Sequence, residues 1–273
     1  MLRKAYLEIT NVCNLDCSFC HKTKREKGFL SDEEFSALIK KIRPHTDYLY
    51  FHLMGEPLLH PHFGDFLKKA TEEGFKITVA TNGFLIKKRA DELYDTPPYK
   101  VTFSLHSYEA NETDISVEEY IEPIIAFCKK AEGLGTICVL RLWNKGGENL
   151  LNDSILGMLK NHFSFSENRK GYRLSEKIYL EFADRFIWPD KAADKQEVHF
   201  CMGLRDQIGV LSDGTVVPCC LDADGSIPLG NLFCSSLEEI MSSERARAIY
   251  NGFSEGRCTE DLCSRCQYAT RFN

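Results

Sequence analysis

Short apolar segments alternate with amphipathic ones along the first two thirds of the chain. Six segments are rich in β-branched and aromatic residues and short enough for buried parallel strands. They cover residues 5–10, 48–55, 76–83, 100–107, 136–143 and 177–182. Between them, apolar positions recur with the period of a helix over residues 31–42, 62–74, 87–94, 117–133 and 152–163. Ser31 and Glu34 predict a capping box at the first of these helices.

This alternation predicts an α/β fold with a parallel sheet, right-handed connections and helices on the outside. Six strands are fewer than the eight of a closed barrel. We therefore expect a partial, TIM-like (βα)6 barrel in residues 1–183. In such folds the chemistry takes place at the carboxyl ends of the strands.

The pattern changes after residue 183. Residues 184–200 read as a linker, and residues 207–220 hold two β-type runs joined by a Ser-Asp-Gly turn, which predicts a hairpin. A helix-like segment follows at residues 236–253. A tail of this size cannot bury a core alone, and metal centres commonly stabilise such small units. We predict that residues 184–273 form the linker and a small hairpin-and-helix metal domain.

Composition and charge restrict the function. No run approaches the ~18 apolar residues of a membrane span, and no signal peptide precedes the first strand, so a cytoplasmic protein is expected. The formal net charge of −6 gives no reason to expect nucleic acid or a membrane as partner. Twelve cysteines in a cytoplasmic chain indicate metal or redox chemistry rather than disulfides.

Three cysteines follow the first predicted strand with the spacing C-x3-C-x2-C: Cys13, Cys17 and Cys20. A [4Fe–4S] cluster normally takes four thiolates, so a loop that offers three leaves one iron open to another ligand. Zinc is the alternative, but it usually takes a fourth Cys or His at regular spacing, and His21 is poorly placed beside Cys20. We predict an iron–sulfur cluster on this loop.

With Phe19 before the last cysteine, the loop resembles that of the radical S-adenosylmethionine (SAM) enzymes. A second motif, at the end of the second strand, resembles the family's GGEP turn with methionine in place of the first glycine. It consists of Met54, Gly55, Glu56 and Pro57. The resemblance implies that SAM binds the open iron, that this turn meets its amino group, and that SAM cleavage yields a 5′-deoxyadenosyl radical. It also places Phe19 among the cofactor-binding residues.

Polar residues near the ends of later strands are further candidates for SAM binding. Family members contact the ribose and carboxylate of SAM at these levels, where Ser104 offers a hydroxyl and Arg141 a guanidinium. An ordinary polar residue at a strand end is an equally good interpretation of each. His52 and His106 are candidates for a role toward the substrate, with a structural role as the alternative.

Four cysteines in the tail predict a second metal centre: Cys201, Cys219, Cys263 and Cys266. Four thiolates close a cluster fully, and zinc fits the same local spacing. Beside the first motif, the set resembles the Twitch form of the SPASM extension of radical SAM enzymes, which implies one auxiliary [4Fe–4S] cluster. Cys220 and Cys258 remain alternative ligands or hydrogen-atom donors.

The resemblance implies a radical SAM oxidoreductase with two [4Fe–4S] clusters and SAM as cofactors. Its architecture is similar to that of the 2-deoxy-scyllo-inosamine dehydrogenases, so we predict a net oxidation of a small molecule in which the auxiliary cluster accepts an electron. The alternatives are a ribosomal-peptide-modifying enzyme (crosslinking or epimerisation) and a non-catalytic iron–sulfur or zinc protein. The expected partners are a small-molecule or peptide substrate and a flavodoxin- or ferredoxin-type reductant.

Overall fold

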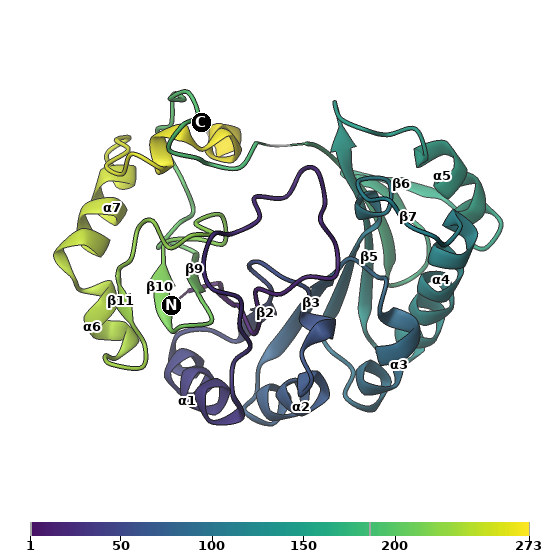
Figure 1. Ribbon diagram of the computed structural model, residues 1–273, viewed down its shortest axis with the longest axis horizontal. Coiled ribbons are helices and arrows are strands. Elements are labelled where there is room, and N and C mark those ends of the chain that lie inside the picture. Colours follow the sequence, from purple (N-terminus) through teal and green to yellow (C-terminus); the bar gives the residue numbers. More distant parts are fainter. Residues whose placement is uncertain (1, 186, 273) are drawn as a thin grey trace.

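Six parallel strands lie side by side in the order in which they follow one another in the chain (Figure 1). The structure, a computed structural model, describes residues 2–185 and 187–272. Each strand falls on a predicted segment, and the partial α/β barrel is confirmed. The strands are β1 (Lys4–Leu7), β2 (Tyr48–Phe51), β3 (Lys76–Thr81), β4 (Lys100–Ser104), β5 (Ile137–Lys145) and β8 (Ile178–Asp184).

Helices surround this sheet on its outer side (Figure 1). They are α1 (Asp32–Ile42), α2 (Phe63–Glu72), α3 (Ile86–Asp95), α4 (Val117–Gly133) and α5 (Asn152–Lys160). The predicted capping box opens α1: the backbone N–H of Glu34 donates to Ser31 Oγ at 3.2 Å, and that of Ser31 donates to Glu34 Oε2 at 2.8 Å. Such a box satisfies two backbone donors that the first helical turn leaves unpaired.

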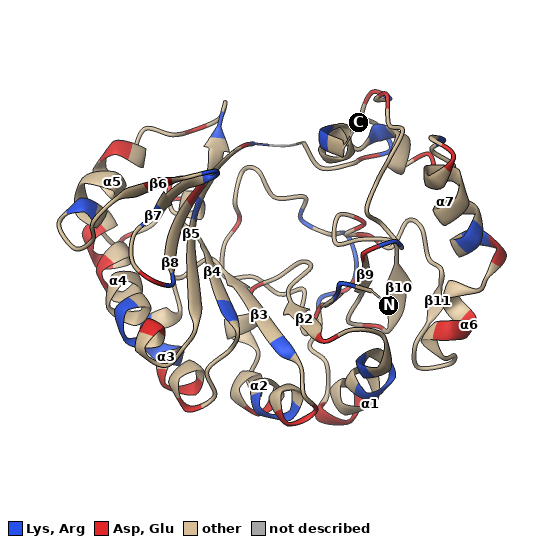
Figure 2. Cartoon of the chain, turned by 180° about the vertical axis from the view of Figure 1, so that it is seen from behind, with Lys and Arg blue, Asp and Glu red and all other residues tan. Residues whose placement is uncertain are grey.

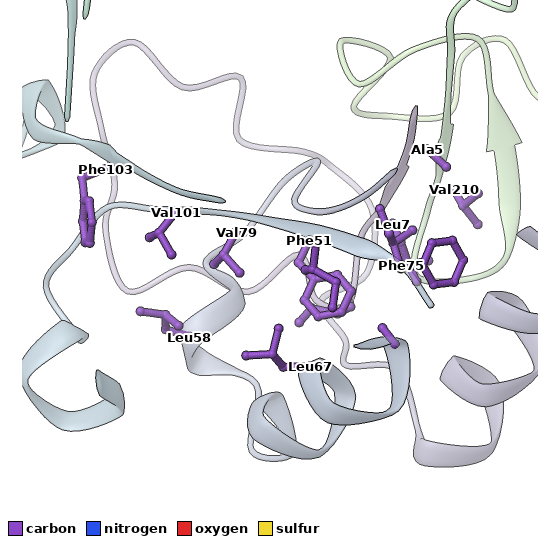
Figure 3. Packing of buried hydrophobic residues seen from close by; sticks show 14 of the residues in the cluster. Ala5, Leu7, Phe51, Leu58, Leu67, Phe75, Val79, Val101, Phe103 and Val210 are labelled. Atoms are coloured by element: carbon purple, nitrogen blue, oxygen red, sulfur yellow. The ribbon is translucent and has the colours of Figure 1, made fainter. Parts of the chain in front are cut away.

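The strands have an apolar outer side and a polar inner side. Leu7, Phe51, Val79 and Phe103 are fully buried against the helices (Figure 3). Successive side chains of a strand point to opposite sides, so the residues between these positions lie on the side away from the helices, which we call the inner face. Among them are Tyr6 on β1, His52 just beyond β2, Ser104 on β4 and Arg141 on β5.

The tail continues the same sheet. The predicted hairpin is confirmed as β9 (Gln207–Val210) and β10 (Thr215–Val217), and β9 pairs in parallel with β1, with Tyr6 opposite Gly209. Strand β11 (Gly230–Asn231) follows at that edge, while β6 (Ser166–Asn168) and β7 (Gly171–Arg173) extend the other edge from β8. The domain limit predicted at residue 183 remains a prediction, and the sheet is continuous across it.

The single helix predicted over residues 236–253 is wrong in one respect. Two helices occupy this segment, α6 (Leu237–Met241) and α7 (Glu244–Ser254). The break arises because Ser243 caps a new helix: its Oγ accepts the backbone N–H of Ala246 at 3.3 Å. Among the described residues, no helix has the length and apolar character needed to cross a membrane.

Candidate functional site

The three-cysteine loop leaves the carboxyl end of β1 and crosses the middle of the molecule before α1 begins (Figure 1). Burial raises the pKa of Cys13 to about 11, and the nearby thiols of Cys17 and Cys20 act in the same direction. Burial likewise raises the pKa of Cys17. The three thiols therefore lie near one another, and Cys13 and Cys17 stay protonated until a metal centre stabilises their thiolates.

Two asparagines hold this loop from neighbouring strands. Asn111, in the loop after β4, donates its side-chain N–H to Cys17 Sγ at 3.1 Å and accepts the backbone N–H of Asp16 at 2.8 Å. Asn82, after β3, donates to Asn14 Oδ1 at 2.9 Å and lies 3.9 Å from Cys13 Sγ. Hydrogen bonds of this kind orient thiolate ligands and tune a cluster. Sequence reasoning missed Asn111, which carries no local signal.

The Gly-Glu-Pro turn packs directly against the cysteine loop. Gly55 has φ +76°, and a Cβ there would lie 2.4 Å from the carbonyl oxygen of Thr10 and 2.8 Å from that of Val12. Only glycine fits both this conformation and this contact. The backbone N–H of Glu56 donates to the carbonyl of Val12 at 2.9 Å, and Pro57 opens a short 3-10 turn. The two predicted motifs therefore form one unit.

The carboxylate of Glu56 is committed to the backbone. It accepts the N–H groups of Asn82 at 2.7 Å and Leu58 at 3.1 Å. Burial raises the pKa of Glu56 to about 7, and these two hydrogen bonds oppose the shift. The side chain thus fixes the turn to the end of β3, while its predicted role toward SAM stays a prediction.

Ser104 and Arg141 are brought together on the inner face, opposite each other on β4 and β5. The Arg141 guanidinium donates to Ser104 Oγ at 2.9 Å. Burial lowers the pKa of Arg141 to about 10, and Glu181 opposes this shift, so the group stays charged at neutral pH. The ring of Phe19 lies 4.9 Å from that of His106 just beyond β4. The predicted SAM-binding residues therefore gather at one end of the sheet.

The four tail cysteines line a single cavity with mostly apolar walls. Neither Cys220 nor Cys258 lies on its wall, although Cys258 contacts Cys263, so the choice of ligands remains a prediction. Burial raises the pKa of Cys201 and raises that of Cys266 to about 11. Within residues 2–185 and 187–272, no three Cys, His, Asp or Glu side chains are arranged to hold one metal ion. Four thiols around one apolar cavity suit an iron–sulfur cluster, which takes four thiolates. The four cysteines of the wall are Cys201, Cys219, Cys263 and Cys266.

Comparison with known proteins agrees with both motifs. The model of the radical SAM superfamily matches residues 7–154, more than half of the chain. The chain belongs to the radical SAM superfamily. A second model, SPASM, described as an iron–sulfur cluster-binding domain, matches residues 201–267. Radical SAM and SPASM regions together imply SAM, a SAM-binding [4Fe–4S] cluster and auxiliary cluster binding, and the donor sets described above fit these groups.

Curated radical SAM relatives match part of the chain. The tungsten-containing aldehyde ferredoxin oxidoreductase cofactor-modifying protein of Pyrococcus furiosus is 34% identical over 89 residues, 31% of this chain and 25% of that protein. The GTP 3′,8-cyclase of a Nostoc species is 29% identical over 129 residues, 43% of this chain and 39% of that enzyme. The chain thus spans less than half the length of these relatives.

Solved structures match nearly the whole radical SAM chain. BtrN in complex with AdoMet and 2-DOIA superposes with a TM-score of 0.65 at 19% identity, covering 98% of this chain and 93% of BtrN. SuiB of Streptococcus suis bound to the precursor peptide SuiA superposes with a TM-score of 0.63 at 14% identity. The match covers 97% of this chain and 70% of SuiB. At these identities the likeness concerns the fold.

In this radical SAM chain a buried carboxylate joins the two cysteine regions. Glu8 is fully buried beyond β1, and both of its carboxylate oxygens accept hydrogen bonds from the Arg25 guanidinium, at 2.6 and 2.7 Å. Glu8 also accepts the backbone N–H of Met54 at 3.2 Å and the hydroxyl of Ser212 at 3.1 Å. Arg25 in turn donates to the carbonyl of Ala223 at 2.9 Å. One ion pair therefore ties the cysteine loop, the Gly-Glu-Pro turn and the tail together.

A second contact supports this junction. Asp224 accepts hydrogen bonds from the Thr23 hydroxyl at 2.7 Å and the backbone N–H of Lys24 at 3.0 Å, and pairs with His21 at 2.7 Å. The basic segment 21–27 is thus partly a contact with the tail rather than a free charged loop. No sequence signal indicated these pairs, because their members lie about two hundred positions apart.

Removing the buried charge at this junction is expected to destabilise the protein. Glu8→Gln leaves the Arg25 guanidinium, 15% exposed, without a charged partner, which costs about 3–5 kcal/mol of unfolding free energy. Urea unfolding under anaerobic conditions measures this. The matched control is Asp206→Asn, which breaks the exposed pair with Arg3 and should cost less than about 1 kcal/mol. Equal losses of unfolding free energy in Glu8→Gln and Asp206→Asn would contradict the view that the buried Glu8–Arg25 pair stabilises this junction.

Proposed function

We propose that the protein is a radical SAM oxidoreductase that dehydrogenates a small molecule bound at the inner face of the sheet. Cys13, Cys17 and Cys20 would hold the SAM-binding cluster, and the four cysteines of the tail cavity would hold one auxiliary [4Fe–4S] cluster. When bound, SAM and its cluster supply the 5′-deoxyadenosyl radical that takes a substrate hydrogen atom, and the auxiliary cluster supplies an acceptor for one electron. The substrate radical also releases one proton to solvent, so the substrate loses two hydrogens in all: one as an atom and one as an electron plus a proton.

The observation that carries this proposal is the meeting of both cysteine regions at the inner face. Cys20 and Cys220 pack against the same group of buried residues, which includes Tyr6 and Met54. A Cβ at Gly209, opposite Tyr6, would lie 3.1 Å from the carbonyl oxygen of Cys219. The chain beside the four-thiol cavity therefore crosses the inner face close to the cysteine loop. A substrate there would lie within reach of both centres.

The remaining site residues would bind and orient SAM. The turn of Gly55, Glu56 and Pro57 would meet its amino group, Ser104 its ribose, and the charged guanidinium of Arg141 its carboxylate. Phe19 would pack beside the bound cofactor. We further propose a flavodoxin- or ferredoxin-type reductant and a cytoplasmic location, since twelve cysteines, none in a disulfide among the described residues, suit a reducing compartment.

The test of oxidation is the product. Reconstituted protein, SAM and a reductant are incubated with panels of small molecules and peptides, and product masses are compared with 5′-deoxyadenosine formed. Dehydrogenation predicts a product lighter than its substrate by H2. A product of unchanged mass would contradict it. The likeness to BtrN, solved with 2-DOIA, supports the small-molecule panel, and that to SuiB with its peptide supports the peptide panel.

A second candidate, redox-neutral epimerisation, is favoured by the place of Cys220. Its thiol hydrogen-bonds with the phenol of Tyr6 on the inner face and lies outside the four-thiol cavity. A thiol here can transfer its hydrogen atom to a substrate carbon radical, which forms the C–H bond and leaves a thiyl. One electron and one proton from the reductant system then restore the thiol.

Deuterium incorporation from D2O separates the two candidates. For dehydrogenation we expect no solvent deuterium at the reacting carbon, and Cys220→Ala should still form both 5′-deoxyadenosine and product. Deuterium in an inverted product that disappears in Cys220→Ala would establish epimerisation instead. Cys234→Ala is the control, because Cys234 is exposed and outside both cysteine groups. Mass spectrometry of the product provides the measurement.

A further inference from the structure

Basic side chains gather on the inner face of the sheet. Figure 2 shows one basic position, a lysine, on the otherwise uncharged strand β4. Lys4 opens β1 and Lys100 opens β4, and each directly precedes a residue that is buried in the outer core, Ala5 or Val101. The alternation of side chains along a strand therefore puts both lysines on the inner face, at the amino ends of their strands. Arg141 lies on the same face toward the carboxyl end, opposite Ser104.

The two lysines lie within electrostatic reach of one another. Lys4 Nζ is 5.0 Å from the ring centre of Tyr6 and 5.2 Å from that of Tyr50, both inner-face residues. Burial lowers the pKa of Lys4; Cys220 and Asp206 oppose this shift, and the Lys100 and Arg3 cations add to it. Burial also lowers the pKa of Lys100; Glu181 opposes this shift, and Lys170 and Arg141 add to it. The cations thus repel one another in a partly buried place.

Carboxylates near these cations are engaged with other basic side chains. Glu181, opposite Arg141 on β8, is also 3.8 Å from Lys170. Asp206, the acid near Lys4, pairs with Arg3 at 3.4 Å, and Glu8 is bound to Arg25. Over residues 2–185 and 187–272, the ammonium groups of Lys4 and Lys100 form no ion pair or hydrogen bond. The two lysines therefore keep their donors available for a ligand.

Unpaired polar atoms lie beside the same cations. Nδ1 of His52 and Nε of Arg141 are buried and have no hydrogen-bond partner. Burial lowers the pKa of His52 to about 3, with Arg141 and Lys4 acting in the same direction, and burial lowers that of His106 to about 4. Both imidazoles are therefore neutral at pH 7. Buried polar atoms without partners are rare in proteins, and a bound ligand is one way to satisfy them.

We propose that the substrate carries an anionic group, a carboxylate or a phosphate, and that Lys4 and Lys100 receive it at the inner face. This rests on the proposed function only in taking the inner face as the substrate site. Charge-assisted hydrogen bonds from ammonium groups are strong, and a bound anion offsets the repulsion among the cations of this face. Arg141 remains free for the carboxylate of SAM, so the lysines account for a second anion.

Small anions test the inference without knowledge of the substrate. Reconstituted holoprotein saturated with SAM is titrated by calorimetry with inorganic phosphate and, separately, with succinate. At least one probe should bind, and Lys4→Gln or Lys100→Gln should weaken it about tenfold or more. The probe that binds distinguishes phosphate from carboxylate recognition. Lys40→Gln is the control: its side chain is exposed on α1, on the outer side of the sheet, and its effect should stay below about twofold.

The pH dependence follows from the same groups. Because the pKa values of the free lysines are lowered, the ammonium forms are lost earlier than usual as pH rises, and anion affinity should fall with them. Binding favours the charged lysines, so it should take up protons in the alkaline range. The double variant Lys4→Arg/Lys100→Arg keeps both charges as pH rises, so it should retain binding and lose this alkaline fall.

Two outcomes would overturn the inference: neither probe binds wild type up to about 10 mM, or the glutamine variants bind as tightly as wild type. 5′-Deoxyadenosine formation in the same samples reports separately on the proposed function. Wild type that forms it but binds neither anion refutes only the anion inference. Protein that binds the anion through the lysines but never forms 5′-deoxyadenosine refutes only the proposed function.

Discussion

Replacing Cys263 and Cys266 with alanine is expected to lower the iron content of reconstituted protein from about eight to about four atoms per chain. Both residues lie on the wall of the tail cavity with Cys201 and Cys219. The variant keeps only the thiolates of Cys201 and Cys219. Two irons of a four-iron cluster would then have no ligand and would face apolar walls, so the cluster should be lost. The cysteine loop is untouched, so 5′-deoxyadenosine should still form from SAM while oxidised product disappears.

Iron and sulfide assays with electron paramagnetic resonance measure this loss. The matched control is Cys258→Ala, which removes a nearby cysteine that contacts Cys263 but lies outside the cavity wall. It should keep about eight irons. An unchanged iron count in the double variant would contradict the auxiliary site. A loss of about four irons in Cys258→Ala would instead make Cys258 a ligand.

Gly55→Ala is expected to reduce SAM cleavage by about a hundredfold or more. The new Cβ would overlap the carbonyl oxygens of Thr10 and Val12, 2.4 and 2.8 Å away, and backbone atoms cannot rotate aside as a flexible side chain can. The turn and the cysteine loop must therefore separate. A shift of about 1 Å in a reacting group is enough for a loss of that size. The positive φ adds about 1–2 kcal/mol of strain.

The control for this substitution is Gly157→Ala within α5, where a Cβ would meet nothing within 4 Å. Alanine there should raise stability by about 0.5–1 kcal/mol and leave SAM cleavage unchanged. Calorimetric titration with SAM and a 5′-deoxyadenosine assay distinguish the two variants. Normal SAM binding by Gly55→Ala would show that the turn does not help to form the cofactor site.

The elements were predictable because their signals are local. Six strands, five outer helices and the hairpin follow from hydrophobic period and turn residues, and the capping box at Ser31 from two residues three positions apart. The break at Ser243 was missed because a serine inside a helical pattern marks a cap only when the chain turns there. Local signals thus identify elements more reliably than the joints between them.

Contacts between distant segments escaped prediction. The Glu8–Arg25 pair with Ser212 and the Asn111–Cys17 contact depend on how the tail and the strand loops fold over the cysteine loop. A Glu in a strand-like run and an Asn in a loop occur in many proteins without any such partner, so neither residue type signals the contact. Cysteine spacing was informative because it is a local signal. The three ligands of a cluster on one loop must lie a few residues apart, and this spacing can be read without knowing how distant segments fold.

Radical formation from SAM at the three-cysteine loop underlies every step proposed for this protein, and it can be assayed without knowing the substrate. Anaerobically reconstituted protein is mixed with SAM and dithionite, and 5′-deoxyadenosine is measured by chromatography in wild type and in Cys17→Ala. We expect the product in wild type and only background in the variant, which should still fold and bind iron at the tail. Absence of 5′-deoxyadenosine from wild type that carries its full iron content would show that the loop does not generate the radical.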